Sequence, residues 1–68
     1  MKRKKVKKIL NKTLPAIPYI SQHIVMINDC FCFYTSFRIE TNILRLYVCS
    51  EEFLSIRLKD IKKFKRFS

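Results

Sequence analysis

Lysine and arginine are the residues of this chain whose number and placement could do chemistry. The 68 residues include 15 Lys and Arg against 5 Asp and Glu, a formal net charge of +10. Seven of these cations precede residue 13, six lie between residues 57 and 66, and two lie between the groups. Cationic side chains neutralise phosphates and release the counterions of a nucleic acid. The two basic ends therefore predict binding to a polyanion, with RNA as the candidate.

The two cations in the middle of the chain, Arg38 and Arg45, predict a further contact. The hairpin register that the sequence predicts sets them opposite each other. Two like charges directly across a sheet repel unless an anion lies between them. Tyr34 and Tyr47 fall nearby on the same face and can stack on unpaired bases. A second interpretation stays open, in which both arginines are solvated and Glu40 screens them.

The residues predicted to contact RNA are the cations of the two ends and of this face. They are Lys2, Arg3, Lys4, Lys5, Lys7, Lys8, Lys12, Arg38, Arg45, Lys62, Lys63, Lys65 and Arg66. The N-terminal and the C-terminal groups would each hold a separate stretch of phosphate backbone, and the two central arginines a phosphate or a base.

No set of residues predicts catalysis or metal binding. His23 is the only histidine, and a nucleophile, a base and an orienting group cannot all be found. Three cysteines share a predicted face with His23, but Cys30 and Cys32 lack the C-x2-C spacing of a zinc knuckle, and free thiols are the default. The chain has no glycine, which excludes glycine-rich phosphate loops. We therefore expect no enzyme, no metal, no cofactor and no small-molecule substrate.

A run of apolar and aromatic residues from Ile24 to Val48 predicts the core. From residue 31 the apolar side chains alternate with polar ones, a period typical of a strand, and the alternation resumes after Thr41-Asn42. Asn28-Asp29 offers a second two-residue turn, because Asn tolerates a positive φ. Residues 23–49 are therefore predicted to form a three-stranded antiparallel meander.

The two predicted turns define a register in which one face of the meander is apolar. The opposing pairs on that face are Ile39 and Leu44, Phe37 and Leu46, Thr35 and Val48, Met26 and Phe31, and Ile24 and Phe33. Because both hairpins agree, we expect this face to be the core side. Cys30, Cys32 and Tyr34 then fall on the outer face.

Residues 1–14 are predicted to form a basic amphipathic helix. Apolar residues recur at three- and four-residue spacing from Val6 to Leu10, and Lys or Arg fills most other positions. Two prolines end this helix, because each biases the residue before it to extended geometry. Residues 15–22 are therefore predicted to be a linker.

Residues 50–67 are predicted to form a second helix. Ser50-Glu51-Glu52 is typical of an N-cap with acids in the first turn, basic residues fill the last turn, and apolar residues follow at helical spacing. A fourth strand at residues 53–59 is the alternative, since apolar and polar residues also alternate there. The expected fold class is α+β, a single small basic domain of residues 1–68 whose three-stranded antiparallel meander is flanked by an N-terminal basic helix and a C-terminal helix.

Size and composition limit the setting in which this chain acts. A chain this short buries only about 60% of the surface that its unfolded form exposes, so we expect a partner to complete the fold. No run approaches the roughly 20 apolar residues of a membrane span, and the odd cysteine count favours a reducing compartment. Mitochondrial import segments favour Arg and Ser, whereas the basic start is nearly all Lys. We expect a cytoplasmic location rather than a mitochondrial one.

The order of these elements carries a family resemblance. Val6-Lys7-Lys8-Ile9-Leu10, Phe37-Arg38-Ile39, and Leu46-Tyr47-Val48 followed by Ser50-Glu51-Glu52 make the chain resemble protein thirty-eight of the eukaryotic large ribosomal subunit. A lineage-specific ribosomal protein of similar shape is an equal alternative. Either resemblance implies a structural ribosomal protein whose partners are ribosomal RNA and neighbouring ribosomal proteins.

The strand-rich interpretation of residues 53–59 supports a second function. With that strand, the chain is similar to the small sporulation proteins of the YabP type. The alternative function is therefore a non-catalytic protein–protein interaction module or coat component, which would use an uncovered sheet face or an edge strand.

Overall fold

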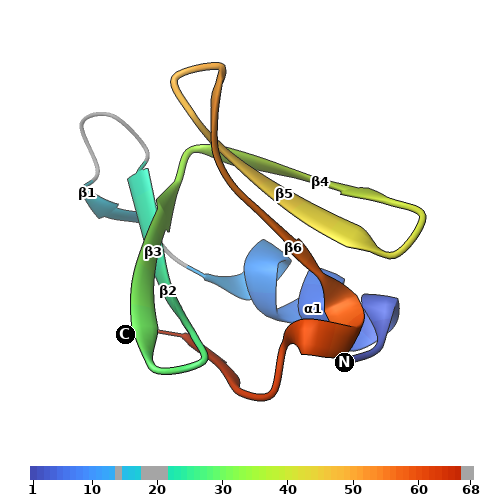
Figure 1. Ribbon diagram of the computed structural model, residues 1–68. Coiled ribbons are helices and arrows are strands. Elements are labelled where there is room, and N and C mark those ends of the chain that lie inside the picture. Colours follow the sequence, from blue (N-terminus) through green and yellow to red (C-terminus); the bar gives the residue numbers. More distant parts are fainter. Residues whose placement is uncertain (14, 18–21, 67–68) are drawn as a thin grey trace.

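Within residues 1–13, 15–17 and 22–66, which the computed structural model describes, the chain forms one α-helix followed by antiparallel strands (Figure 1). The elements are α1 (Arg3–Lys12), β1 (Pro15–Ile17), β2 (Gln22–Ile27), β3 (Cys30–Tyr34), β4 (Ser36–Glu40), β5 (Ile43–Val48), β6 (Glu51–Arg57), the 3₁₀ turn η2 (Leu58–Asp60) and β7 (Phe64–Arg66). The fold class is α+β, as predicted.

The strands form two antiparallel sheets. In sheet A, β3 pairs with one edge of β2, while β1 and β7 share its other edge, β1 near Gln22 and β7 near Ile27. Sheet B has the order β4-β5-β6. Figure 1 shows the two sheets meeting where β3 leads into β4, with α1 in the angle between them.

Both predicted hairpins form with the predicted register. The pairs include Ile24 with Phe33, Met26 with Phe31, Phe37 with Leu46, Arg38 with Arg45, and Ile39 with Leu44. The turns depend on left-handed backbone, with φ of 51° at Asn28, 67° at Asp29 and 57° at Thr41. Asn and Asp adopt this conformation readily, whereas a β-branched residue such as Thr41 does so at a cost.

The predicted single meander is correct for the two hairpins and wrong for the connection between them, because a bend at Thr35 divides residues 30–40 between the two sheets. The Thr35 N–H and hydroxyl both donate to the Tyr47 carbonyl oxygen, at 2.7 and 3.2 Å, and the Cys49 N–H donates to the Thr35 hydroxyl at 3.1 Å. The predicted pair of Thr35 and Val48 is therefore not formed. The last pair of this ladder is instead Ser36 with Tyr47.

The bend reverses the parity of the residues that face the core. Tyr34 is buried, and Phe37 packs against the core from the next strand. These inward residues are three positions apart, whereas an unbroken strand would place them two apart. The prediction carried one parity through the whole segment and so assigned the wrong face to β3.

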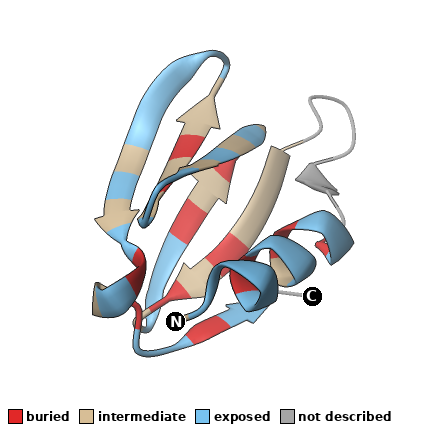
Figure 2. Ribbon diagram, turned by 90° about the vertical axis from the view of Figure 1, so that its right-hand side faces the viewer, coloured by how far each residue is buried: buried red, intermediate tan, exposed pale blue. Residues whose placement is uncertain are grey.

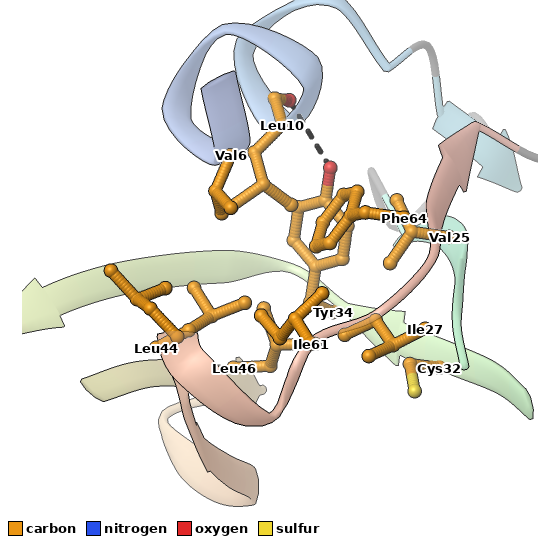
Figure 3. Packing of buried hydrophobic residues seen from close by; sticks show 11 residues of the cluster. Val6, Leu10, Val25, Ile27, Cys32, Tyr34, Leu44, Leu46, Ile61 and Phe64 are labelled. Carbon is orange, nitrogen blue, oxygen red and sulfur yellow. Dashed lines mark hydrogen bonds between the residues drawn. The ribbon is translucent and has the colours of Figure 1, made fainter. Parts of the chain in front are cut away.

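The buried core contains the face of β2 and β3 that was predicted to be outer. Its members are Val6, Leu10, Val25, Ile27, Cys32, Tyr34, Leu44, Leu46, Leu58, Ile61 and Phe64 (Figure 3). The prediction is correct for β5, whose Leu44 and Leu46 are fully buried, and wrong for Phe31, which is 56% exposed. Apolar residues occupy both faces of this hairpin, so alternation alone does not choose between them.

The docking of α1 decides between these two faces. Val6 and Leu10 of the helix are buried in the core, as the helical spacing predicted. The Tyr34 hydroxyl donates to the Leu10 carbonyl oxygen at 3.1 Å (Figure 3). Near its C-terminus a helix has carbonyl groups without i+4 partners. The Leu10 carbonyl oxygen accepts the N–H of the C-cap Thr13 at 3.4 Å, and Tyr34 adds a second, closer hydrogen bond to it.

The predicted second helix is also wrong, and the alternative of a fourth strand is closer to the structure. Residues Glu51–Arg57 form β6, which pairs with β5. Ser50 has a φ of 72° and belongs to the tight turn that precedes β6, so it is not a helix N-cap. The apolar residues that gave the helical spacing beyond Arg57 are Leu58, Ile61 and Phe64. All three are buried in the core, Leu58 in η2, Phe64 in β7 and Ile61 between these two elements.

The predicted linker contains the short strand β1, which pairs with the start of β2. Residues 18–21 of this linker, residue 14 of the predicted first helix and residue 67 of the predicted second helix lie outside the described part of the chain. The first helix was predicted over residues 1–14, and α1 begins and ends within two residues of those limits, at Arg3 and Lys12.

Two neighbouring substitutions test which face of β2 is buried. We expect Ile27→Ala to lower the free energy of unfolding by about 2–5 kcal/mol, because Ile27 is 3% exposed and its loss leaves a cavity. Met26→Ala, on the partly exposed face, should cost about 1 kcal/mol or less. Urea denaturation measures both values. A larger cost for Met26→Ala would show that the face predicted from the sequence is the buried one.

Candidate nucleic-acid interface

The outward side of α1 carries the first group of predicted RNA-contacting cations. All of them are exposed: Lys2, Arg3, Lys4, Lys5, Lys7, Lys8 and Lys12. Figure 2 shows this exposed side of the helix turned away from the sheets. Within the residues that the structure describes, none of the seven forms an ion pair.

The N-terminal end of α1 is electrostatically unfavourable in the free protein. Its first turn contains no acid, and Lys2 at the N-cap makes no side-chain hydrogen bond to the helix. Cations placed at the positive end of the helix macrodipole are destabilising, and an anion bound there would be stabilising. The local charge therefore favours an anionic ligand over a solvated surface.

The C-terminal group of predicted cations lies beside α1. β7 joins sheet A next to the helix, and the Arg66 guanidinium reaches the Lys12 carbonyl oxygen at 3.5 Å across 54 positions of sequence. The exposed cations of this segment are Lys62, Lys63, Lys65 and Arg66. Together with the cations of α1 they form what we call the α1–β7 surface. The sequence predicted two separate contacts, whereas the fold places both groups side by side (Figure 2).

Asn28 positions the segment that leads into β7. Its side-chain oxygen accepts hydrogen bonds from the N–H groups of Lys62 and Lys63, at 2.7 and 3.0 Å. Its side-chain amide donates to the Asp60 carbonyl oxygen at 2.9 Å, and its own N–H donates to the Lys63 carbonyl oxygen at 2.9 Å. The Lys63 ammonium also pairs with Asp29 at 3.2 Å. The turn at Asn28-Asp29 therefore also holds the backbone of residues 60–63, which lead to the C-terminal cations. The sequence of the turn gives no indication of this role.

The arginines of sheet B are already paired with acids. Arg38 and Arg45 lie opposite each other as predicted. Glu40 lies 3.7 Å from Arg38 and 3.4 Å from Arg45, and Glu52 accepts a hydrogen bond from Arg45 at 2.6 Å. That hydrogen bond raises the pKa of the Arg45 guanidinium. These contacts match the interpretation in which Glu40 screens the arginines, and no anion is needed to explain the pair.

Tyr34 was predicted to lie on the outer face, and this prediction is wrong. It is 2% exposed, and its hydroxyl is bound to the Leu10 carbonyl oxygen. Burial raises the pKa of this hydroxyl. His23 stacks on the Tyr34 ring with the ring centres 4.9 Å apart, and its Nδ1 lies 2.8 Å from the Thr13 carbonyl oxygen. Tyr34 therefore supports α1 and is not available to stack on a base.

A groove that the sequence did not predict runs between α1 and β4. It has a volume of about 750 Å³. Its lining includes Met1, Lys2, Arg3, Lys4, Lys7, Phe37, Arg38, Ile39, Asn42 and Leu58. Cations form one side of this α1–β4 groove and apolar side chains of β4 contribute to the other. No local pattern reveals it, because it exists only where α1 lies alongside β4.

The cysteines, the histidine and the acids do not gather into a metal site in the described structure. Among the described residues, no three His, Cys, Asp or Glu side chains come close enough together to hold a metal ion. Cys30 and Cys49 are exposed free thiols, whereas Cys32 is buried and its burial raises the pKa of that thiol. Within the same part of the chain, the structure contains no helix that is long and apolar enough to span a membrane.

Comparison with known proteins finds no matching family model, no similar curated protein and no similar solved structure. The function is therefore argued from the geometry of the chain itself.

Replacing Asn28 tests whether it holds the C-terminal cations in place. Asn28→Ala removes three side-chain hydrogen bonds and places alanine at a φ of 51°. We expect it to lower the free energy of unfolding by about 2–4 kcal/mol and to speed amide exchange in β7. Asn42→Ala, in the other hairpin turn, is the control and should cost less than about 1 kcal/mol. Unchanged exchange at Phe64–Arg66 in the Asn28 variant would contradict this role.

Proposed function

We propose that this protein is a non-catalytic RNA-binding protein, a structural component of a ribonucleoprotein particle. The α1–β7 surface contacts the phosphate backbone, with the cations of α1 and of residues 62–66 acting together. Phosphate contacts of this kind provide affinity and position a protein without reading sequence.

The observation that carries this proposal is the distribution of ion pairs. Four of the five acids pair with cations. The pairs are Asp29 with Lys63, Glu40 with Arg38 and Arg45, Glu52 with Arg45, and Asp60 with Arg57. The helix cations have no such partner in the described structure, and those of β7 add to them from the side. Most of the net charge of +10 is thus carried by α1 and by residues 62–66 beside it, which favours a polyanion over isolated anions.

The packing of α1 argues against a membrane surface as the polyanion. A helix that binds at the interface of a bilayer inserts its apolar face among the lipids. The apolar face of α1 is already used, because Val6 is fully buried and Leu10 is 3% exposed in the protein core. Membrane insertion would require the helix to leave the core, whereas phosphate binding requires no change.

Charge placement, more than family resemblance, supports the ribosome as the particle. Residues 51–57 form β6 where the resemblance to the large-subunit protein implies a helix. A small, strongly basic chain that leaves its cations unpaired is nevertheless suited to ribosomal RNA, and neighbouring ribosomal proteins can cover its apolar surface. We place the protein in the cytoplasm on this basis.

Two double variants with the same charge change test the RNA surface. Lys8→Gln with Lys12→Gln removes two cations of the α1–β7 surface, and Arg38→Gln with Arg45→Gln removes two from sheet B. We expect the first pair to reduce the slope of log affinity for single-stranded RNA against log salt by about 1.4, at roughly 0.7 for each phosphate contact. The second pair should leave this slope unchanged. Fluorescence anisotropy over a salt series measures both. An equal or larger effect of the arginine pair would include sheet B in the RNA site, which the sequence predicted in addition to the two basic ends.

Sedimentation tests the particle. We expect tagged protein in a cell extract to migrate with a ribosomal subunit in a sucrose gradient and to leave it after ribonuclease treatment or in high salt. Migration as a small species that resists nuclease would contradict the ribosomal proposal.

A second candidate function, protein–protein interaction in a coat or similar assembly, is favoured by the outer face of sheet A. That face carries Ile24, Met26, Phe31 and Phe33, and Phe53 of β6 lies against Phe33 with the ring centres 6.4 Å apart. Phe53 is 52% exposed, and exposed apolar patches mark interaction sites. The strand β6 also keeps the strand-rich arrangement that resembles the YabP-type sporulation proteins. An assembly held by this face would be insensitive to ribonuclease and to salt, so the same gradient distinguishes the two functions.

A further inference from the structure

The α1–β4 groove combines three kinds of surface that one ligand can use together. Arg3, Lys4 and Lys7 of α1 line it with positive charge, and Phe37 and Ile39 of β4 line it with half-buried apolar side chains. Its volume of about 750 Å³ falls within the range of ligand-binding sites, roughly 300–1,000 Å³. The third surface is the open edge of β4.

β4 is an edge strand whose outward backbone groups can be identified. It pairs with β5 on one side, and no described strand pairs with its other side. In a two-residue hairpin the closing pair, here Glu40 with Ile43, exchanges hydrogen bonds, and bonded pairs then alternate along the ladder. The backbone groups of Phe37 and Ile39 therefore point away from β5.

The hydrogen bonds on the other side of β5 support this assignment. The Leu58 N–H donates to the Asn42 carbonyl oxygen at 2.8 Å, in line with the pairing of β5 to β6. Backbone groups alternate in direction along a strand. The even-numbered residues of β5, like Asn42, therefore bond to β6, and the odd-numbered residues of β5 bond to β4. Phe37 and Ile39, which lie opposite Leu46 and Leu44, are thus left with N–H and C=O groups at the open edge of β4, and both residues line the groove.

We propose that this groove binds an acidic, extended segment of a partner protein, which adds to sheet B as a strand beside β4. The backbone of the segment bonds to Phe37 and Ile39, as in other recognition by strand addition. Its acidic side chains contact Lys4 and Lys7, and its alternate side chains pack against the apolar lining. This goes beyond RNA binding, since it gives the protein a second partner, which contacts α1 from the side of β4 and shares Lys4 and Lys7 with the α1–β7 surface.

The geometry selects this occupant over two others. RNA can satisfy the cations, but it has no repeating row of backbone donors and acceptors that matches a strand edge. A second copy of the chain would pair β4 with β4 and bring the cations of both helices together, and such like charges repel.

The experiment measures binding of a fluorescein-labelled peptide of alternating Asp and Val to the full chain by anisotropy. We expect Lys4→Gln with Lys7→Gln to weaken binding about fivefold to tenfold. Lys5→Gln with Lys8→Gln removes the same charge from the same helix outside the groove, and should change affinity less than about twofold. A peptide with N-methyl groups on alternate residues keeps its charge but loses backbone donors, and should bind at least about tenfold more weakly.

Amide exchange reports the site directly. We expect the peptide to slow exchange of the outward Phe37 and Ile39 amides. The Arg38 and Glu40 amides, already bonded to β5, serve as internal controls and should not change. Equal weakening by the two lysine pairs, an undiminished affinity of the methylated peptide, or unchanged exchange at Phe37 and Ile39 would each overturn the proposal.

A short uridine oligonucleotide provides the last comparison. Slowed exchange at Phe37 and Ile39 with the oligonucleotide, together with displacement of the peptide, would assign the groove to RNA and overturn strand addition. The variants Lys8→Gln and Lys12→Gln that test the RNA surface lie outside the groove, so either proposal can fail while the other stands.

Discussion

A bend at Thr35 determines which side chains of this chain reach the core and which reach the solvent. The N–H and the hydroxyl of Thr35 both donate to the Tyr47 carbonyl oxygen. These hydrogen bonds hold the bend at which the chain leaves sheet A and enters sheet B. The bend turns Tyr34 toward α1, where its hydroxyl holds the Leu10 carbonyl oxygen. With α1 fixed by this contact and by its buried apolar face, its cations point outward and its first turns lie along β4. The α1–β7 surface and the α1–β4 groove both depend on that placement.

Charge separation is the second organising feature of the molecule. Four of the five acids pair with cations of sheet B and of the segment before β7, while α1 keeps its positive charge without a partner in the described structure. Repulsion among these cations weakens the free folded state. An anionic partner would remove that repulsion and stabilise the fold by its binding free energy. RNA on the α1–β7 surface and an acidic protein strand in the α1–β4 groove would act in the same direction.

The absence of glycine adds to the cost of this fold. Within the described residues, the tight turns place five residues other than glycine at positive φ: Asn28, Asp29, Thr41, Cys49 and Ser50. A left-handed conformation costs roughly 1–2 kcal/mol for a residue with a side chain, less for Asn and Asp. In a chain that buries so little surface, these turns leave a small margin of stability. Asn28 offsets part of its own cost through the hydrogen bonds that it makes to residues 60–63.

The sequence by itself determined the features that depend on near neighbours. These are α1, both hairpin turns, the register that sets Arg38 opposite Arg45, and the grouping of cations at the two ends. Only the tertiary structure decided the buried face of β2 and β3, because both faces are apolar and the choice depends on where α1 docks. It also decided that residues 51–57 form a strand, since their spacing fits either period and β5 supplies hydrogen-bond partners from a distant part of the chain. The pairing of Glu52 with Arg45, the contact of β7 with α1 and the groove beside β4 follow from those choices, and contacts between distant residues leave no local pattern to read.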